Sequence, residues 1–274
     1  MSNITASEVN KLRKATGAGM MDCKNALVEA KGDFELAIEN LRKKGQKVAA
    51  KRADRDSSEG AVIAMVNDNK TKGVIISLNC ETDFVAKNES FVDLAKSFCK
   101  TALNCSSLDE LLNSTHESMT VSEKLIEQTG VIGEKLEIGA FESVSSEYVG
   151  FYIHSGNKIA TLAGLSNKFE NASNVSKNVA MQVAAMNPIA LNEDSVSKEI
   201  IEKEIEIAKE QLRTEGKPEA MLDNIAKGKL KKFFKDNTLV KQAYIKDNKS
   251  SVENYIQSEN NECVITDFKR VALV

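Results

Sequence analysis

A chain of 274 residues, of which 42% are hydrophobic, is long enough to bury one large core or several smaller ones, so we expect a globular protein. Lys and Arg total 37 against 40 Asp and Glu, and a formal net charge of -3 disfavours direct binding of nucleic acid through phosphate neutralisation. No apolar run approaches the length of a membrane helix and no secretory signal pattern opens the chain, so a cytoplasmic protein without membrane contact is expected.

Three helices are predicted near the N-terminus. The first begins at Thr5, which opens a capping-box sequence, and the second ends at Gly32. The third is capped by Asp33 and should close at Gly45, because glycine commonly ends a helix. Residues 47–55 are polar and basic, which predicts a tether. The first part of the chain is therefore expected to be a compact three-helix module on a linker.

A β-hairpin is predicted next, from the apolar segments 60–66 and 73–78. The segment Cys80–Asn88 follows the second strand and precedes a helix, and it sets the carboxylate of Asp83 beside the ring of Phe84. A loop held between two rigid elements is a common place for functional residues. The residues alone leave a second interpretation open, in which Phe84 fills the local core and Asp83 caps a turn.

The same order of elements recurs further along the chain. Segments 149–154 and 159–163 predict a second hairpin followed by a helix, and strands at 136–141 and 263–271 close the first and second halves. This repetition predicts an internal duplication of two α+β subdomains side by side. A second Thr-Asp-Phe sequence at 266–268 lies in the last strand, so a structural role is expected for it.

An insertion at residues 187–228 interrupts the second half. Its apolar positions repeat at coiled-coil spacing, and Gly216 to Pro218 turn the chain, which predicts a projecting antiparallel helical hairpin. The hairpin is either a spacer or a surface that touches a partner or a second copy, and the sequence does not decide between them. The residues expected to form its seam are Ile201, Ile205, Ala208, Leu212, Met221, Leu222 and Ile225.

Residue types that usually carry chemistry are few and scattered. The five cysteines include no Cys-x-x-Cys pair, which argues against a disulfide framework and a zinc site. His116 and His154 are each expected at the surface or in a turn rather than as a catalytic base. The Gly-x-Gly at residues 17–19 does not follow a strand, and no Walker motif is present. We therefore predict no metal, no cofactor and no enzyme activity.

Separate motifs agree in identity and order with those of one family. The first is residues 12–27 followed by Gly32–Ala37, and the second is Thr82-Asp83-Phe84-Val85-Ala86-Lys87 after the first hairpin. Residues 215–218 and 229–233 are a third similarity. Together these motifs resemble the bacterial elongation factor Ts family over nearly the whole chain.

The resemblance implies a guanine nucleotide exchange factor that binds elongation factor Tu, a GTPase, and promotes GDP release by disturbing its magnesium and phosphate site, with no covalent chemistry. A homodimer of that heterodimer is a further possibility. The residues implied to enter the magnesium site are Thr82, Asp83, Phe84 and Val85. The residues implied to make a second contact through the N-terminal module are Leu12, Arg13, Met20, Met21 and Lys24. Helical geometry favours one of the two methionines in the core and the other exposed.

The expected fold class is α+β with antiparallel sheets. A UBA-like three-helix module and linker should occupy residues 1–56, a core subdomain N residues 57–139, and a subdomain C residues 140–274, interrupted by the coiled-coil hairpin. Gln182 stands where many members of the family carry a histidine, so a partner contact at this position would lack the imidazole ring and its charge.

Two functions of other classes stay open at this point. An adaptor that recognises a protein through residues 1–55 would not need Asp83 or Phe84. A small-molecule enzyme would use Cys80 as its nucleophile and Asp83 as acid or base, although no base is placed near Cys80 in the sequence.

Overall fold

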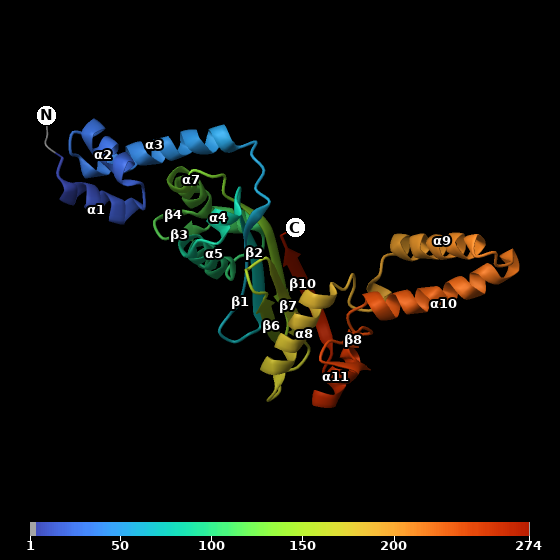
Figure 1. Cartoon of the computed structure of the whole chain (residues 1–274). Helices are drawn as coiled ribbons and strands as arrows, with labels where there is room; N and C mark the ends of the chain where they lie inside the picture. Colours follow the sequence, from blue (N-terminus) through green and yellow to red (C-terminus); the bar gives the residue numbers. More distant parts are fainter. Residues whose placement is uncertain (1–3, 274) are drawn as a thin grey trace.

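The computed structural model describes residues 4–273 and is an elongated α+β molecule (Figure 1). N-terminal helices lie at one end, a layered core of sheets and helices lies in the middle, and a helical hairpin projects from the far side of the core. Within the described range, no helix has both the length and the apolar content that crossing a bilayer requires.

The N-terminal helices start where the sequence predicts. Thr5 caps the first helix, because its Oγ1 accepts a bond from the Glu8 amide at 3.3 Å while the Glu8 carboxylate accepts from the Thr5 amide at 2.7 Å. Asp33 caps the third through the Leu36 amide at 3.0 Å. The helices are α1 (Ala6–Thr16), α2 (Met20–Glu29) and α3 (Phe34–Arg52). Their shared core consists of Val9, Leu12, Ala18, Cys23, Ala26, Leu27, Ala30 and Ala37.

The predicted end of the third helix at Gly45 is wrong, because α3 continues to Arg52. Gly45 is buried where α3 crosses α7 (Val121–Ile132), and a Cβ atom built on it would come within 3.2 Å of the Ile126 carbonyl oxygen. Glycine therefore serves here as a close-packing residue inside a helix rather than as a helix terminator. Residues 47–52 are helical, so most of the expected tether is a rigid element.

The core of the described chain holds two three-stranded antiparallel sheets, and both predicted hairpins and both returning strands are confirmed. In each sheet the returning strand pairs with the second strand of the hairpin, so the strand orders correspond. The first sheet consists of β1 (Glu59–Val66), β2 (Lys72–Cys80) and β5 (Glu137–Ser145). The second consists of β6 (Tyr148–Ile153), β7 (Ile159–Leu165) and β10 (Ile265–Ala272).

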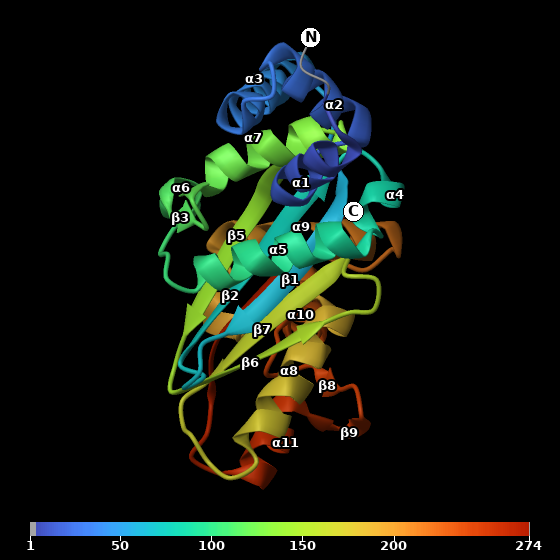
Figure 2. The same cartoon turned by 90° about the vertical axis from the view of Figure 1, so that its left-hand side faces the viewer.

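The two sheets pack against each other with helices on their outer faces. Alternate residues of a strand point to opposite sides, so Ile63 of β1 packs with α5 (Glu89–Ala102) and α7, whereas Val62 faces the second sheet. On the other side, α8 (Ala172–Met186) and α11 (Val252–Glu259) cover the second sheet. Figure 2 shows α3 lying over α7 at the end of the core away from α11.

His116 corrects a further expectation, since it is buried instead of exposed. Its ring lies 3.3 Å from the Ser97 hydroxyl and 3.1 Å from the Thr101 hydroxyl, and it packs edge-on against Phe98. Burial lowers the pKa of His116, so the neutral form is favoured. The remaining short elements are α4 (Asp83–Ala86), α6 (Leu108–Asn113), β3 (Thr115–His116), β4 (Met119–Thr120), η1 (Glu193–Ser195), β8 (Ala243–Tyr244) and β9 (Asp247–Ser251).

The projecting hairpin is formed by α9 (Lys198–Thr214) and α10 (Glu219–Asn237), with the predicted turn between them (Figure 1). It extends to Asn237, beyond the predicted limit of residue 228. Leu212 and Leu222 are buried in the seam as expected, but Met221 is 51% exposed and lies outside it. Successive helix positions are about 100° apart, so Leu222 and Met221 cannot both face α9.

Candidate functional site

The segment after β2 folds into the single-turn helix α4. Thr82 is its N-cap, since its hydroxyl oxygen accepts a bond from the Val85 amide at 3.4 Å, and the Lys87 amide closes the turn on the Asp83 carbonyl at 3.1 Å. Val85 and Ala86 pack against the core beneath the first sheet. One side of the turn is thus anchored in the core of the first half.

Phe84 lies on the opposite side of the turn and is 83% exposed, more than any other large hydrophobic side chain in the described range. The interpretation in which Phe84 fills the local core is therefore wrong. Burying an exposed phenyl ring stabilises an association by about 2–3 kcal/mol, so a protein that covered this ring would gain a strong apolar contact.

Asp83 lies beside Phe84 and pairs with Lys87, whose Nζ is 2.6 Å from the Asp83 carboxylate. The bond donated by Lys87 lowers the pKa of Asp83, and the same contact raises the pKa of Lys87. Both groups are therefore charged across the physiological range. A partner that takes the Asp83 carboxylate must offer a donor in place of Lys87.

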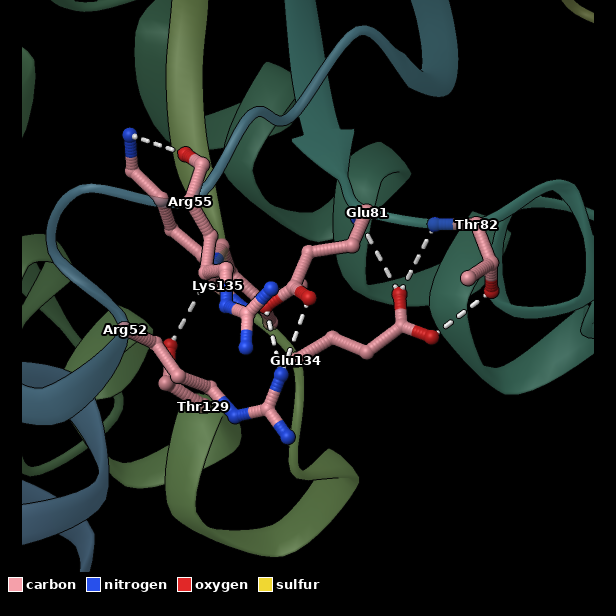
Figure 3. Close-up of polar contacts among 8 residues, drawn as sticks. Arg52, Arg55, Glu81, Thr82, Thr129, Glu134 and Lys135 are labelled. Atoms are coloured by element: carbon pink, nitrogen blue, oxygen red, sulfur yellow. Dashed lines mark hydrogen bonds and ion pairs between the residues drawn. The ribbon is translucent and has the colours of Figure 1, made fainter.

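Glu134, in the loop after α7, holds the base of the turn (Figure 3). Its carboxylate accepts bonds from the amides of Glu81 and Thr82 at 3.1 and 3.0 Å, and from the Thr82 hydroxyl at 2.7 Å. Hydrogen bonds to a charged acceptor are stronger than neutral ones. Three such bonds fix the backbone immediately before α4.

Glu81 forms a second fixation point from the same backbone segment (Figure 3). Its two carboxylate oxygens accept from Arg52 Nη1 at 2.8 and 2.9 Å, and one of them accepts from the Lys135 amide at 2.7 Å. Burial on its own would raise the pKa of Glu81, but the bonds from Lys135 and Arg52 outweigh it and the pKa is lowered. The end of α3 and the loop after α7 are thereby joined at the base of the turn.

The comparisons with known proteins show which family the chain belongs to. Residues 81–273 match the family described as Elongation factor TS. An Elongation factor Ts from Christiangramia forsetii is 66% identical over 273 residues, covering 100% of both chains. The chain belongs to the elongation factor Ts family. Proteins of the same name from Flavobacterium psychrophilum and Porphyromonas gingivalis are 63% and 43% identical, covering 100% and 98% of each chain respectively. The recognition made from the motifs is confirmed.

In this member of the elongation factor Ts family, Cys80 is unsuited to be a nucleophile. The thiol is buried and donates to the Thr82 carbonyl at 3.2 Å. Burial, with the nearby Glu134 carboxylate, raises the pKa of Cys80 to about 12, so the reactive thiolate is not populated near neutral pH. The enzyme hypothesis loses its nucleophile.

The N-terminal residues implied by the family resemblance divide into two groups. Leu12 is fully buried in the module core, because it faces α2 and α3 from the inner side of α1, so its assignment as a contact residue is corrected. Arg13 and Lys24 are exposed. Met20 and Met21 are 55% and 63% exposed, which overturns the expectation that one would be buried. They begin α2, whose core positions start only at Cys23.

Gln182 is completely buried in α8 instead of lying at the surface. Its amide nitrogen donates to the Gln242 side chain at 3.2 Å and to the Ala243 carbonyl at 3.1 Å, while its oxygen accepts from the Ile245 amide at 2.8 Å. The side chain is thus occupied within the chain and ties α8 to the β8 region. A direct partner contact at Gln182 would require this region to open.

Proposed function

We infer that this chain is a guanine nucleotide exchange factor for elongation factor Tu in translation elongation, and that it acts by binding without covalent chemistry. The observation that supports this most directly is the exposed Phe84 on a turn whose base is held by two carboxylates. The match to the family begins at residue 81 and so includes this turn. An adaptor that used only the N-terminal module would leave the turn without a role.

We propose that the turn enters the GTPase near its nucleotide. Guanine nucleotides are held largely by contacts to their phosphates and to a magnesium ion with an octahedral shell of oxygen ligands. Phe84 wedges between side chains of the GTPase, Asp83 competes for polar partners there, and the supports of the ion shift. Thr82 and Val85 set the direction of the ring, because one caps the turn and the other anchors it.

The energetics are consistent with one aromatic anchor. Exchange is accelerated when the factor binds the nucleotide-free GTPase more tightly than the loaded form, and this antagonism is mutual. Each tenfold acceleration needs about 1.4 kcal/mol of preferential stabilisation. Aromatic residues at the centre of an interface commonly contribute about 2–4 kcal/mol, so Phe84 can supply a large part of a hundredfold effect or more.

The rigidity of the turn adds to this effect. Disordered segments lose conformational freedom when they bind, which weakens association. The bonds that the Glu134 carboxylate accepts and that Arg52 donates order the base of the turn in the free protein. The ring of Phe84 is therefore presented without a large ordering cost at the moment of binding.

A second contact is proposed for the N-terminal module, through Met20 and Met21 with Arg13 and Lys24 at the rim. Exposed methionines are flexible and adapt to apolar grooves. Both views place α2 and α4 toward the same end of the molecule, away from α11 (Figures 1 and 2). One GTPase surface could therefore meet both elements.

We also propose the finer division of the fold. Residues 1–56 would form the UBA-like module, 57–139 and 140–274 the duplicated subdomains, and α9 with α10 a coiled-coil insertion. Support comes from the matching strand orders of the two sheets and from a separate hydrophobic cluster in each unit.

The test is stopped-flow release of a fluorescent GDP from the cognate elongation factor Tu. The parent protein should accelerate release strongly, Phe84→Ala should lose most of the acceleration, and Asp83→Ala should lose less. Circular dichroism would verify that each variant is folded. An unchanged rate with the parent protein would overturn the proposed function, and full activity of Phe84→Ala would overturn the role of the turn.

A further inference from the structure

Helix α3 connects the two elements that are proposed to meet the GTPase. Its first half belongs to the module, with Ala37 in the module core, and Arg52 in its last turn bonds to Glu81 at the base of α4. A helix of 19 residues is about 28 Å long. Figure 1 shows α3 extending from the module across α7 toward the core.

The crossing of α3 and α7 is a contact of backbone against backbone. A Cβ atom on Gly130 of α7 would lie 2.4 Å from the Cα atom of Gly45, and one on Gly45 would lie 3.2 Å from the Ile126 carbonyl oxygen. Neither glycine has a positive φ, so the backbone conformation does not require glycine at these positions. The close approach of the two helices does. Any larger residue at position 130 must push the helices apart.

Beyond the glycine contact, the side chains that α3 places beside α7 are small. Ala49 of α3 and Ala53, just after its last residue, line a cavity of about 350 Å³ together with Leu125, Ile126 and Thr129 of α7. Because the space is not filled, the glycine contact sets how closely and at what angle α3 lies on the core.

The ends of the crossing are also fixed. Val131, near the end of α7, packs against the module core. The segment after α3 is held by Lys135 Nζ on the Arg55 carbonyl at 3.2 Å and by the Asn79 amide on the Ser57 carbonyl at 2.9 Å. The module is thus docked on the core at several points.

We propose that Gly45 and Gly130 are positioning residues for nucleotide exchange, because their contact holds the module and the α4 turn as one rigid body. This inference rests on the proposed function. When one element binds, the other is already at the correct distance, so its effective concentration at the GTPase is high. A module on a loose linker would lose this advantage. The affinity of the factor for the GTPase would then fall, whereas the maximal rate of exchange would not.

The proposal predicts a specific division of the kinetic effect. In Gly130→Ala, the concentration of the factor that gives half-maximal exchange should rise at least about tenfold, while the maximal rate at saturation should change less than about twofold, because Phe84 is untouched. The matched control is Gly228→Ala, the same substitution in a helix where a Cβ atom meets nothing within 4 Å. It should leave both quantities unchanged.

A distance measurement provides a readout that is independent of activity. Spin labels at Glu29→Cys in the module and Asp68→Cys in the β1–β2 turn would report their separation in the full chain. The five native cysteines are buried, so they should label poorly. The parent protein and Gly228→Ala should give one narrow distance distribution, and Gly130→Ala should give a shifted or broadened one.

Each outcome decides the proposal. A Gly130→Ala protein with an altered distance distribution and an unchanged half-maximal concentration would overturn it, as would an unaltered distance distribution. If Gly130→Ala does not fold by circular dichroism, Gly45→Ala, whose Cβ contact is less severe, is judged by the same criteria. Failure of the parent protein to accelerate GDP release would instead reject the underlying function, which keeps the two failures distinct.

Discussion

The same three residues occur twice in this chain and lie in opposite environments. Thr82-Asp83-Phe84 caps and opens a one-turn helix whose ring is 83% exposed. Residues 266–268 repeat the tripeptide in the strand β10, where the Thr266 and Ser146 hydroxyls lie 2.7 Å apart and Phe268 packs against the core of the second half. The predicted position of the second copy in a strand is confirmed.

The difference lies in what flanks each copy. The first copy follows the end of a strand. The Glu134 carboxylate accepts hydrogen bonds from two backbone amides there, so these amides do not extend the β-ladder and the chain turns. The second stays in register with β7, with Phe268 opposite Ala163. The tripeptide alone therefore does not determine exposure of the ring, and a fixed base with an unburied ring is what distinguishes the first copy as the proposed wedge.

The largest effect should come from removing the exposed ring. Phe84→Ala should lower the acceleration of GDP release by about 100-fold or more, equivalent to about 2.7 kcal/mol, with little loss of folding stability because the side chain is 83% exposed in the free protein. Phe84→Leu, which keeps part of the apolar group, should lose about tenfold. Stopped-flow release and denaturant unfolding check both parts. A drop in stability for Phe84→Ala would show that the ring has a structural role after all.

Phe268→Ala should give the reverse result. Truncation of a partly buried ring should lower the free energy of unfolding by about 2 kcal/mol, while the folded protein keeps the parent exchange rate. Urea denaturation measures the first quantity and stopped-flow release at saturating factor measures the second. A large exchange defect in folded Phe268→Ala would remove the contrast between the two copies.

Glu134→Gln tests the fixed base with nearly the same shape. A glutamine oxygen can still accept from the two amides, but its NH₂ group must then donate to the Thr82 hydroxyl, which already accepts from the Val85 amide, and the charge that strengthens all three bonds is lost. The acceleration should fall about tenfold, and amide hydrogen exchange of Glu81 and Thr82 should become faster. Full activity together with faster hydrogen exchange would show that a rigid turn is unnecessary.

Local patterns predicted most of the elements. Capping residues such as Thr5 and Asp33, the alternating strands of both hairpins and the turn at Gly216 to Pro218 depend on residues close in sequence, and the structure has them where expected. The candidate turn could also be located, because Phe84 follows a strand and precedes a helix. Its exposure could not be predicted, since both interpretations of the segment fit the sequence.

Contacts between distant residues account for the errors. Glu134 lies 52 residues from Thr82, and nothing near either residue indicates the pair. Gly45 has the local signature of a helix end, but its partner Gly130 decides its role. Leu12 belongs to the family motif and is also a core residue, so a motif does not separate contact residues from packing residues.

The smallest expected effect is the pH dependence of exchange. Asp83 has a lowered pKa because Lys87 donates to it, so its contribution is complete above the ordinary Asp pKa of about 4 and is lost as the pH falls through the lowered value. Lys87 has a pKa raised by Asp83, so its contribution is complete below about pH 10 and is lost only as the pH rises through the raised value. Between pH 6 and 9 neither group should titrate.

The ratio of GDP release rates with and without the factor should therefore stay within about twofold from pH 6 to 9. Titration of groups in the GTPase–nucleotide complex changes both rates, so its effect divides out of the ratio. Cys80, with a pKa of about 12, adds no dependence in this range. A bell-shaped ratio or a rise with pH would point to a titrating group in the mechanism. Such a profile would contradict a wedge that acts by packing and by a preformed ion pair. It would indicate that the two Thr-Asp-Phe copies differ because one takes part in proton transfer, and not because one ring is exposed.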